Sequence, residues 1–146
     1  MSAYSLVLFL HSWLRWALLA TALAALVHAY RARGAAGPDE RAPPAPPVSR
    51  ALIALVHTQL LLGLLLYVAL SPLSRAAFAD MRAAMRSAPL RFVAVEHLAV
   101  MLFAAGFAQF ASIKAKRAPL ARAAHGWRVR GAGVLVALVL AGMPWP

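Results

Sequence analysis

The chain has 146 residues, of which 63% are hydrophobic and 13% are charged, whereas an ordinary soluble domain carries roughly 25% charged residues. This composition excludes a typical soluble domain and predicts one integral membrane domain over residues 1–146. The chain contains no cysteine, which excludes disulfides, thiolate metal sites and covalent cofactor attachment through a CxxCH motif. The net charge of +11 falls mainly in the predicted loops, where lipid headgroups explain it, so nucleic-acid binding is not expected.

Four segments have the length and apolar character of membrane-spanning helices. A bilayer core needs about 20 mostly apolar residues per helical crossing, and the segments run over about 3–30, 49–70, 90–113 and 120–143. The first segment lacks the basic region and the cleavage site of a secretory signal, so we expect it to be the first span. The last segment is the weakest, because its apolar run begins only at Gly131. We therefore predict an all-α, integral membrane four-helix bundle with up-down-up-down topology.

The connection between the second and third predicted spans has an amphipathic pattern. It is bounded by Pro72 and Pro89. At helical spacing its apolar face carries Phe78, Met81 and Met85, and its basic face carries Arg75, Arg82 and Arg86. This pattern predicts a short helix that lies at the membrane interface. The first connection is rich in proline and glycine and is expected to be a loop.

The distribution of basic residues predicts the orientation in the membrane. The first loop, Arg31 to Arg50, holds four arginines, and the third, Lys114 to Arg130, holds six Lys or Arg. The second loop holds four. Because basic loops stay on the cytoplasmic side, both termini should face the periplasm of a bacterial inner (plasma) membrane. Trp145 would then lie at the level of the lipid headgroups.

Four histidines fall at matching depths of the predicted spans. His11 and His97 each lie about eight residues, or roughly 12 Å, from the outer ends of spans one and three. His57 and His125 lie toward the inner ends of spans two and four. Spans one and three are diagonal in such a bundle, as are two and four, so each pair could bind one haem iron from opposite sides. The alternative for any single histidine is a hydrogen bond that packs two helices.

Two charged residues accompany the outer pair. Arg15 follows His11 by four residues and shares its helix face. An arginine at that depth needs an anion, and the candidates are Glu96, next to His97, and a haem propionate. An Arg15–Glu96 ion pair that only joins two helices is equally compatible with the sequence. Glu96 could instead orient a ligand. The fifth histidine, His28, lies within one turn of Arg31, and snorkelling to the membrane surface explains it.

A copper site is a further alternative. Met81 and Met85, with Asp80 and the outer histidines, would provide soft ligands for copper on the outer side. A hydrophobic face at the membrane interface explains the same two methionines. Hydrolytic chemistry is not supported, since the sequence shows no serine–histidine–acid set, no suitably placed pair of carboxylates and no glycine-rich phosphate loop.

Several strings resemble a known family. HSWLRW in the first span, HTQLLLGLLLY followed by SP, ADMRAAMRS leading to RFVAVEH, and the terminal MPWP are similar to small four-span bacterial membrane proteins that are usually labelled cytochrome-b-like. The resemblance covers nearly the whole chain. The positions that match the family are His11, Arg15, His57, Asp80, Met81, Met85, Glu96, His97 and His125; His28 does not match.

The sequence thus leads to one expected function and two alternatives. The resemblance and the histidine pattern imply an electron carrier, rather than a stand-alone enzyme, with one or two non-covalent b haems. The outer haem would use His11 and His97, and a possible inner haem His57 and His125. Its partner would be a quinol or a redox partner in the membrane. The alternatives are a non-catalytic accessory subunit of a larger membrane complex and an outward-facing copper-handling protein.

Overall fold

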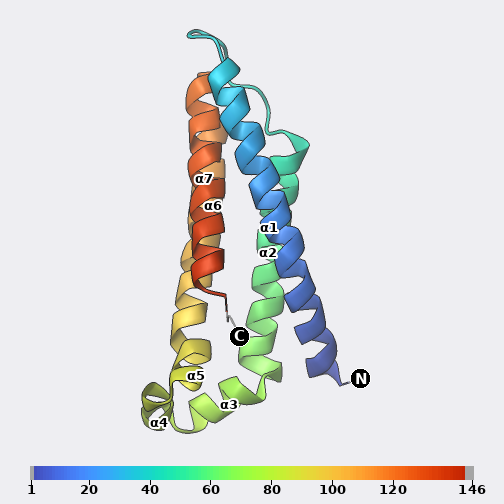
Figure 1. Ribbon diagram of the computed structural model, residues 1–146, viewed down its shortest axis with the longest axis vertical. Helices are drawn as coiled ribbons and strands as arrows, with labels where there is room; N and C mark the ends of the chain where they lie inside the picture. Colours follow the sequence, from blue (N-terminus) through green and yellow to red (C-terminus); the bar gives the residue numbers. More distant parts are fainter. Residues whose placement is uncertain (1, 144–146) are drawn as a thin grey trace.

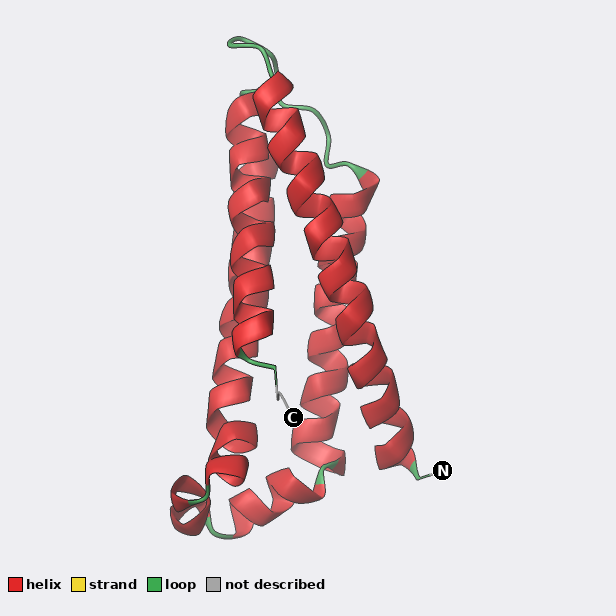
Figure 2. Ribbon diagram, in the orientation of Figure 1, coloured by secondary structure: helices red, strands yellow, loops and turns green. Residues whose placement is uncertain are grey.

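The computed structural model describes residues 2–143, and this part of the chain is helical and contains no strand. Figure 2 shows the helices and the few loops that join them. The helices in chain order are α1 (Ala3–Ala35), α2 (Pro47–Leu65), α3 (Pro72–Ala79), α4 (Met81–Arg86), α5 (Ala88–Arg91), α6 (His97–Arg117) and α7 (Ala121–Ala141). Two π-helical segments, η1 (Leu66–Leu70) and η2 (Phe92–Glu96), continue α2 and precede α6. Trp145, expected at the membrane surface, lies outside the described residues.

The four long helices run antiparallel to their neighbours. Helix α1 packs against α2 and α7, and α6 packs against α7 and, less extensively, against α2. Helices α1 and α6 are therefore diagonal, as the expected order of spans requires. In Figure 1 the α1/α2 pair and the α6/α7 pair lie close together near the loop between α1 and α2 and diverge toward α3–α5. We call these the closed end and the open end of the molecule.

Three helical stretches are long and apolar enough to cross a membrane: Ala3–Ala35, Pro47–Leu70 and Ala88–Arg117. Many of their large apolar side chains point outward; Trp13 is 64% exposed and Phe103 is 62% exposed. Such a surface is compatible with contact to lipid. The fourth predicted span, α7, is not among these stretches, and its first half carries three arginines.

Small residues hold the helices together at the closed end. Ala22 and Ala25 of α1 and Ala108 and Ala111 of α6 are all buried. A Cβ atom at Gly131 of α7 would lie 2.8 Å from the Cβ of Ala111, which is closer than two carbon atoms can approach. Glycine at this position therefore allows α6 and α7 to pack closely, as small residues do between membrane helices.

The proline-rich loop between α1 and α2 is docked on the turn between α6 and α7. The amide of Ala42 donates to the Pro119 carbonyl oxygen at 3.0 Å, and the amide of Ala121 donates to the Glu40 carbonyl oxygen at 2.8 Å. The expected loop is confirmed, and these two hydrogen bonds tie it to the end of the helices.

The single interfacial helix expected between the second and third spans is divided into three short helices. The helical path breaks at Asp80, whose backbone is not helical and whose carboxylate accepts a hydrogen bond from the Ala83 amide at 2.8 Å. Asp80 is thus the N-cap of α4, and a cap of this kind favours the start of a new helix over continuation of the old one. Ala77 and Ala84 are buried with Ala94 in a small second core.

The two π-helical segments meet at the open end. The Tyr67 hydroxyl in η1 donates to the carbonyl oxygen of Ala94 in η2 at 2.8 Å. The wider turn of η2 ends with a hydrogen bond from the His97 amide to the Phe92 carbonyl oxygen, so His97 is the first residue of α6. π-helical turns often occur at functional sites because they alter which side chains face inward.

Candidate functional site

A cavity of about 400 Å³ lies at the open end. It is walled by α1, α2 and the start of α6, bounded by the N-terminal part of α3, and closed on one side by the end of α7. Its volume lies in the range of roughly 300–1,000 Å³ that ligand and cofactor pockets occupy. Its lining is mainly apolar, and its polar members are Tyr4, His11, Ser12, Arg15, Gln59, Tyr67, Ser71, Ser74 and His97.

The two outer histidines face each other in this cavity. His11 of α1 and His97 of α6 both line it, and their ring centres lie 6.5 Å apart with the ring planes at 72°. The sequence placed this pair at equal depth on diagonal helices, and the structure brings the two rings together across the cavity.

The orientation of His97 is fixed by the end of α7. Nδ1 of His97 lies 2.7 Å from the carbonyl oxygen of Gly142. A carbonyl oxygen can only accept, so Nδ1 carries a proton and donates it, and Nε2 is the nitrogen left to face the cavity. A backbone carbonyl that orients the distal nitrogen in this way is the usual companion of a histidine that binds a metal.

His11 is oriented by α2. The side-chain amide nitrogen of Gln59 donates to the backbone oxygen of His11 at 3.0 Å and lies 3.3 Å from its Nε2. A Cβ atom at residue 63 would lie 3.2 Å from Cε1 of the His11 ring, so Gly63 makes room for the imidazole. Two residues one turn apart on α2 thus hold the ring in position.

Unsatisfied polar atoms gather around the same cavity. Five buried side-chain atoms lack a hydrogen-bond partner within the described residues, and four of them belong to residues that line the cavity: His11 Nδ1, Arg15 Nε, Gln59 Oε1 and Ser74 Oγ. The fifth is Gln109 Oε1. Buried polar atoms are normally paired, and each exception calls for a water, an ion or a ligand. This gathering makes the cavity the candidate binding site.

Arg15 lacks the carboxylate partner that the sequence offered. Glu96, which is exposed, accepts a hydrogen bond from Nε of Arg91 at 2.7 Å and forms an ion pair with it. Residues five apart come together in the wider turn of a π-helix, and this explains why Glu96 binds Arg91 rather than Arg15. The guanidinium of Arg15 lies over the Trp16 ring at 5.2 Å, a contact that does not neutralise its charge. Within the described residues Arg15 therefore has no carboxylate partner.

The inner histidines are not brought together. His57 lies on the exposed face of α2, whereas His125 is buried near the start of α7, with Nδ1 3.3 Å from a terminal nitrogen of Arg128. Within residues 2–143 no ring contact joins the two. A shared ligand for His57 and His125 stays a prediction.

The candidate copper ligands Met81 and Met85 lie one turn apart on α4, next to Asp80. Met81 and Met85 are exposed, at 41% and 44%, and the Asp80 carboxylate caps α4. In the described part of the chain no three His, Cys, Asp or Glu side chains form a cluster that could hold a metal ion. His28 is exposed at the closed end.

Sequence reasoning missed the residues that orient the histidines. Gln59 and Gly63 are four apart, so they share a face of α2 with Val56 and Tyr67, and all four line the cavity. That periodicity could have shown that His57, one residue after Val56, points elsewhere. No local pattern indicates that the Gly142 carbonyl bonds His97, because this contact joins residues 45 apart.

Comparisons with known protein families, curated proteins and solved structures find no match to this chain. The candidate site therefore rests on its own geometry.

Proposed function

We propose that this protein is a cytochrome-b-like electron carrier of the membrane that holds one haem b between His11 and His97. The observation that carries the proposal is the facing pair of imidazoles, with ring centres 6.5 Å apart across a cavity of about 400 Å³. No covalent attachment is required, since haem b is held by axial ligands and packing alone.

The residues of the cavity suit such a group in size and chemistry. His11 and His97 would hold the iron between their imidazole rings, whose centres lie 6.5 Å apart. The apolar walls are supplied by Leu8, Val56, Leu60 and Leu98. Apolar walls of this kind would limit the access of water to a bound macrocycle and lower the dielectric constant around it.

Each polar residue of the site has a distinct role in the proposal. The Gly142 carbonyl keeps the proton of His97 on Nδ1 and leaves Nε2 for the iron. Gln59 holds the His11 backbone and ring. Arg15 provides the positive charge for a carboxylate, because Glu96 is already paired with Arg91. Bound iron would supply one-electron oxidation and reduction.

The membrane placement is part of the same proposal. Helices α1, α2–η1 and α5–α6 have the length and apolarity of spans, and α7 would be the fourth, shielded from lipid because it packs against both α1 and α6. Ten of the fifteen Lys and Arg residues lie in the loops and helix segments of the closed end, from Arg31 to Arg50 and from Lys114 to Arg130. By the positive-inside rule the closed end lies in the cytoplasm, and the cavity and both termini lie toward the periplasm of a bacterial inner membrane.

The proposal is limited to one haem. His57 is exposed and His125 is packed against Arg128, so a second haem at the inner pair has less support. Electrons would come from a quinol or from a redox protein in the membrane, and the open end gives access to the outer side.

The decisive experiment is an absorption spectrum of the full-length protein, purified in detergent from haem-replete cells, before and after reduction with dithionite. We expect a Soret band and a sharp α band on reduction. Both should be lost in His97→Ala and in His11→Ala and retained in His28→Ala, the matched control in which an exposed histidine is removed. Loss of only part of the α band in His57→Ala or His125→Ala would reveal a second haem. A colourless wild-type protein would refute the proposal and favour an accessory subunit.

A further inference from the structure

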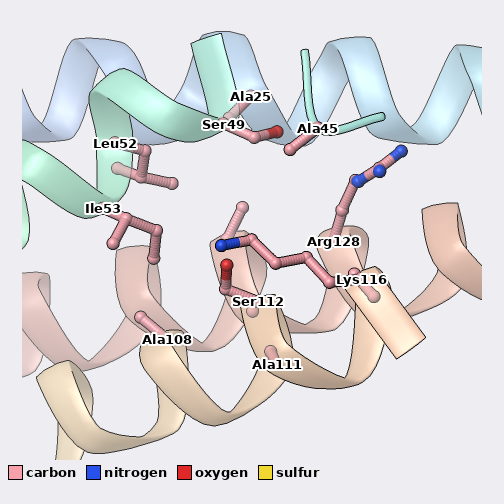
Figure 3. A pocket seen from close by; sticks show the side chains of 13 residues that line it. Ala25, Ala45, Ser49, Leu52, Ile53, Ala108, Ala111, Ser112, Lys116 and Arg128 are labelled. Carbon is pink, nitrogen blue, oxygen red and sulfur yellow. The ribbon is translucent and has the colours of Figure 1, made fainter. Parts of the chain in front are cut away.

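A second, smaller recess lies at the closed end, between α2 and α6. Its volume is about 40 Å³, against roughly 10–15 Å³ for a single water molecule. Figure 3 shows its lining: Ala25 of α1 lies on one side, Ala108 and Ala111 of α6 lie on the opposite side, and the polar members are Ser49, Ser112, Lys116 and Arg128. In this view the Lys116 side chain extends across the recess.

Among the described residues, two basic residues, Lys116 and Arg128, and no acidic residue line the recess. Lys116 is exposed, and in Figure 3 the guanidinium of Arg128 points toward the loop that holds Ala45. Arg128 is only 8% exposed. One terminal nitrogen donates to the Pro43 carbonyl oxygen at 3.0 Å, and the other lies 3.3 Å from Nδ1 of His125. Within the described residues the only ion pair is Arg91–Glu96 at the opposite end, and the nearby Glu40 carboxylate accepts a hydrogen bond from the Gly37 amide. A buried cation without a counter-ion is unfavourable, so the recess favours an anion.

Hydroxyl groups and a helix end add to this preference. Ser49 lies in the first turn of α2, a 19-residue helix whose N-terminus carries a partial positive charge. Ser112 lies one turn before Lys116 on α6, so their side chains share a face. No hydrogen bond from either serine hydroxyl to another described residue is present. Both hydroxyls can therefore donate to an oxyanion.

The polar and apolar parts of the recess are separated along the helix axis. Lys116 is next to the last residue of α6, and Ser49 is the third residue of α2, so both lie where these helices leave the bilayer in the proposed orientation. Leu52 and Ile53, about one turn further into the bilayer, form an apolar wall. A charged group at the membrane surface with apolar contacts below it would match the charged headgroup and the apolar chains of a phospholipid.

We propose that this recess binds a phosphate group, and that an anionic phospholipid of the cytoplasmic leaflet supplies it. Lys116 forms the ion pair, Ser49 and Ser112 donate hydrogen bonds, and Arg128 provides the buried positive charge behind them. The inference rests on the membrane placement proposed above and is independent of haem binding.

The test uses the full chain in detergent, with phosphatidylglycerol or phosphatidylcholine added, and counts retained lipids by native mass spectrometry. We expect one phosphatidylglycerol per chain, held about tenfold more tightly than phosphatidylcholine, as one charge-assisted hydrogen bond would give. Lys116→Gln and Ser112→Ala should each weaken this binding. Arg122→Gln, which removes an exposed charge from the same end but outside the recess, should not.

Equal weakening in Lys116→Gln and Arg122→Gln would overturn the site in favour of a diffuse charge effect, as would the absence of any preference for phosphatidylglycerol. A second arm titrates inorganic phosphate into delipidated protein and follows the phosphorus resonance. If the protein binds free phosphate but no lipid, and Lys116→Gln abolishes the phosphate binding, the recess would be a site for a soluble anion. This result would overturn the proposal that a lipid supplies the phosphate. The absorption spectrum of each variant should match the wild type, which separates this test from that of the haem.

Discussion

The two ends of the molecule are built from the same four long helices, yet one is closed and the other is open. At the closed end Ala22, Ala25, Ala108 and Ala111 are buried, and the space left between the helices is about 40 Å³. At the open end larger and polar side chains line a cavity of about 400 Å³. The size of the side chains between the helices thus decides where the molecule packs and where it can bind a ligand.

Most of the unsatisfied buried polar atoms among the described residues lie at the open end: four of the five line its cavity, and the fifth is Gln109 Oε1. At the closed end the buried Arg128 has two hydrogen-bonding contacts, and the proline-rich loop is tied by backbone hydrogen bonds. At the open end His11, Arg15, Gln59 and Ser74 each keep an unsatisfied buried atom. Substitutions in the tightly packed closed end and in the lining of the large cavity should therefore affect different measurements.

The largest effect is expected from overpacking the closed end. Gly131→Leu would force a side chain into Ala111, whose Cβ already lies 2.8 Å from a Cβ built at residue 131. We expect the free energy of unfolding in detergent to fall by about 3 kcal/mol. Gly106→Leu is the matched control, because a Cβ at Gly106 meets nothing within 4 Å. If both variants were equally stable, close packing of α6 and α7 would not hold the closed end together.

A second substitution should remove haem binding and leave stability unchanged. In Gly63→Leu the new side chain enters the cavity against the His11 ring, since even a Cβ lies 3.2 Å from Cε1. We expect the haem content after purification to fall at least about tenfold, equivalent to ~1.4 kcal/mol, with the free energy of unfolding of the haem-free protein unchanged. Gly106→Leu again serves as control. Full haem content in Gly63→Leu would place the haem elsewhere.

The open end shows which features of the molecule could be predicted from the sequence. Apolar run length predicted helices over four segments because a bilayer crossing imposes a length on each, and depth alone paired His11 with His97 because a regular rise of 1.5 Å per residue converts position into height. Both inferences use only the length and rise of a single helix and the thickness of the bilayer, so each can be made from the sequence of one segment.

What escaped prediction depends on contacts between helices or on local irregularity. Depth does not determine rotation about the helix axis, and so it did not show that His57 lies on the exposed face of α2; a shared ligand for His57 and His125 stays a prediction. The π-helical turn η2 brings Arg91 to Glu96, which a regular helical wheel does not show. Asp80 divides the interfacial segment because its carboxylate caps α4, an effect that amphipathic periodicity does not reveal.

A smaller effect is expected from the charge in the cavity. Arg15→Gln keeps a polar side chain but removes the cation that has no carboxylate partner among the described residues. We expect the dissociation constant for haem to rise about fivefold, the order expected when one charge-assisted hydrogen bond becomes a neutral one. Titration of haem into the haem-free protein measures this change. Glu96→Gln should leave the affinity unchanged, because Glu96 pairs with Arg91; an equal loss in Glu96→Gln would make Glu96 part of the site.

The smallest effect concerns the contact that limits how far the open end diverges. The Tyr67 hydroxyl joins η1 to η2 through the Ala94 carbonyl oxygen at 2.8 Å. Tyr67→Phe keeps the ring contact with Phe78 and removes only this hydrogen bond, so the free energy of unfolding should fall by about 0.5–1 kcal/mol. Tyr30→Phe, in which the ring is 69% exposed, should change it less. Because this hydrogen bond lies at the edge of the cavity, Tyr67→Phe should also increase the rate of haem dissociation. If neither Tyr67→Phe nor Tyr30→Phe changes that rate, the hydrogen bond does not control the opening of the cavity.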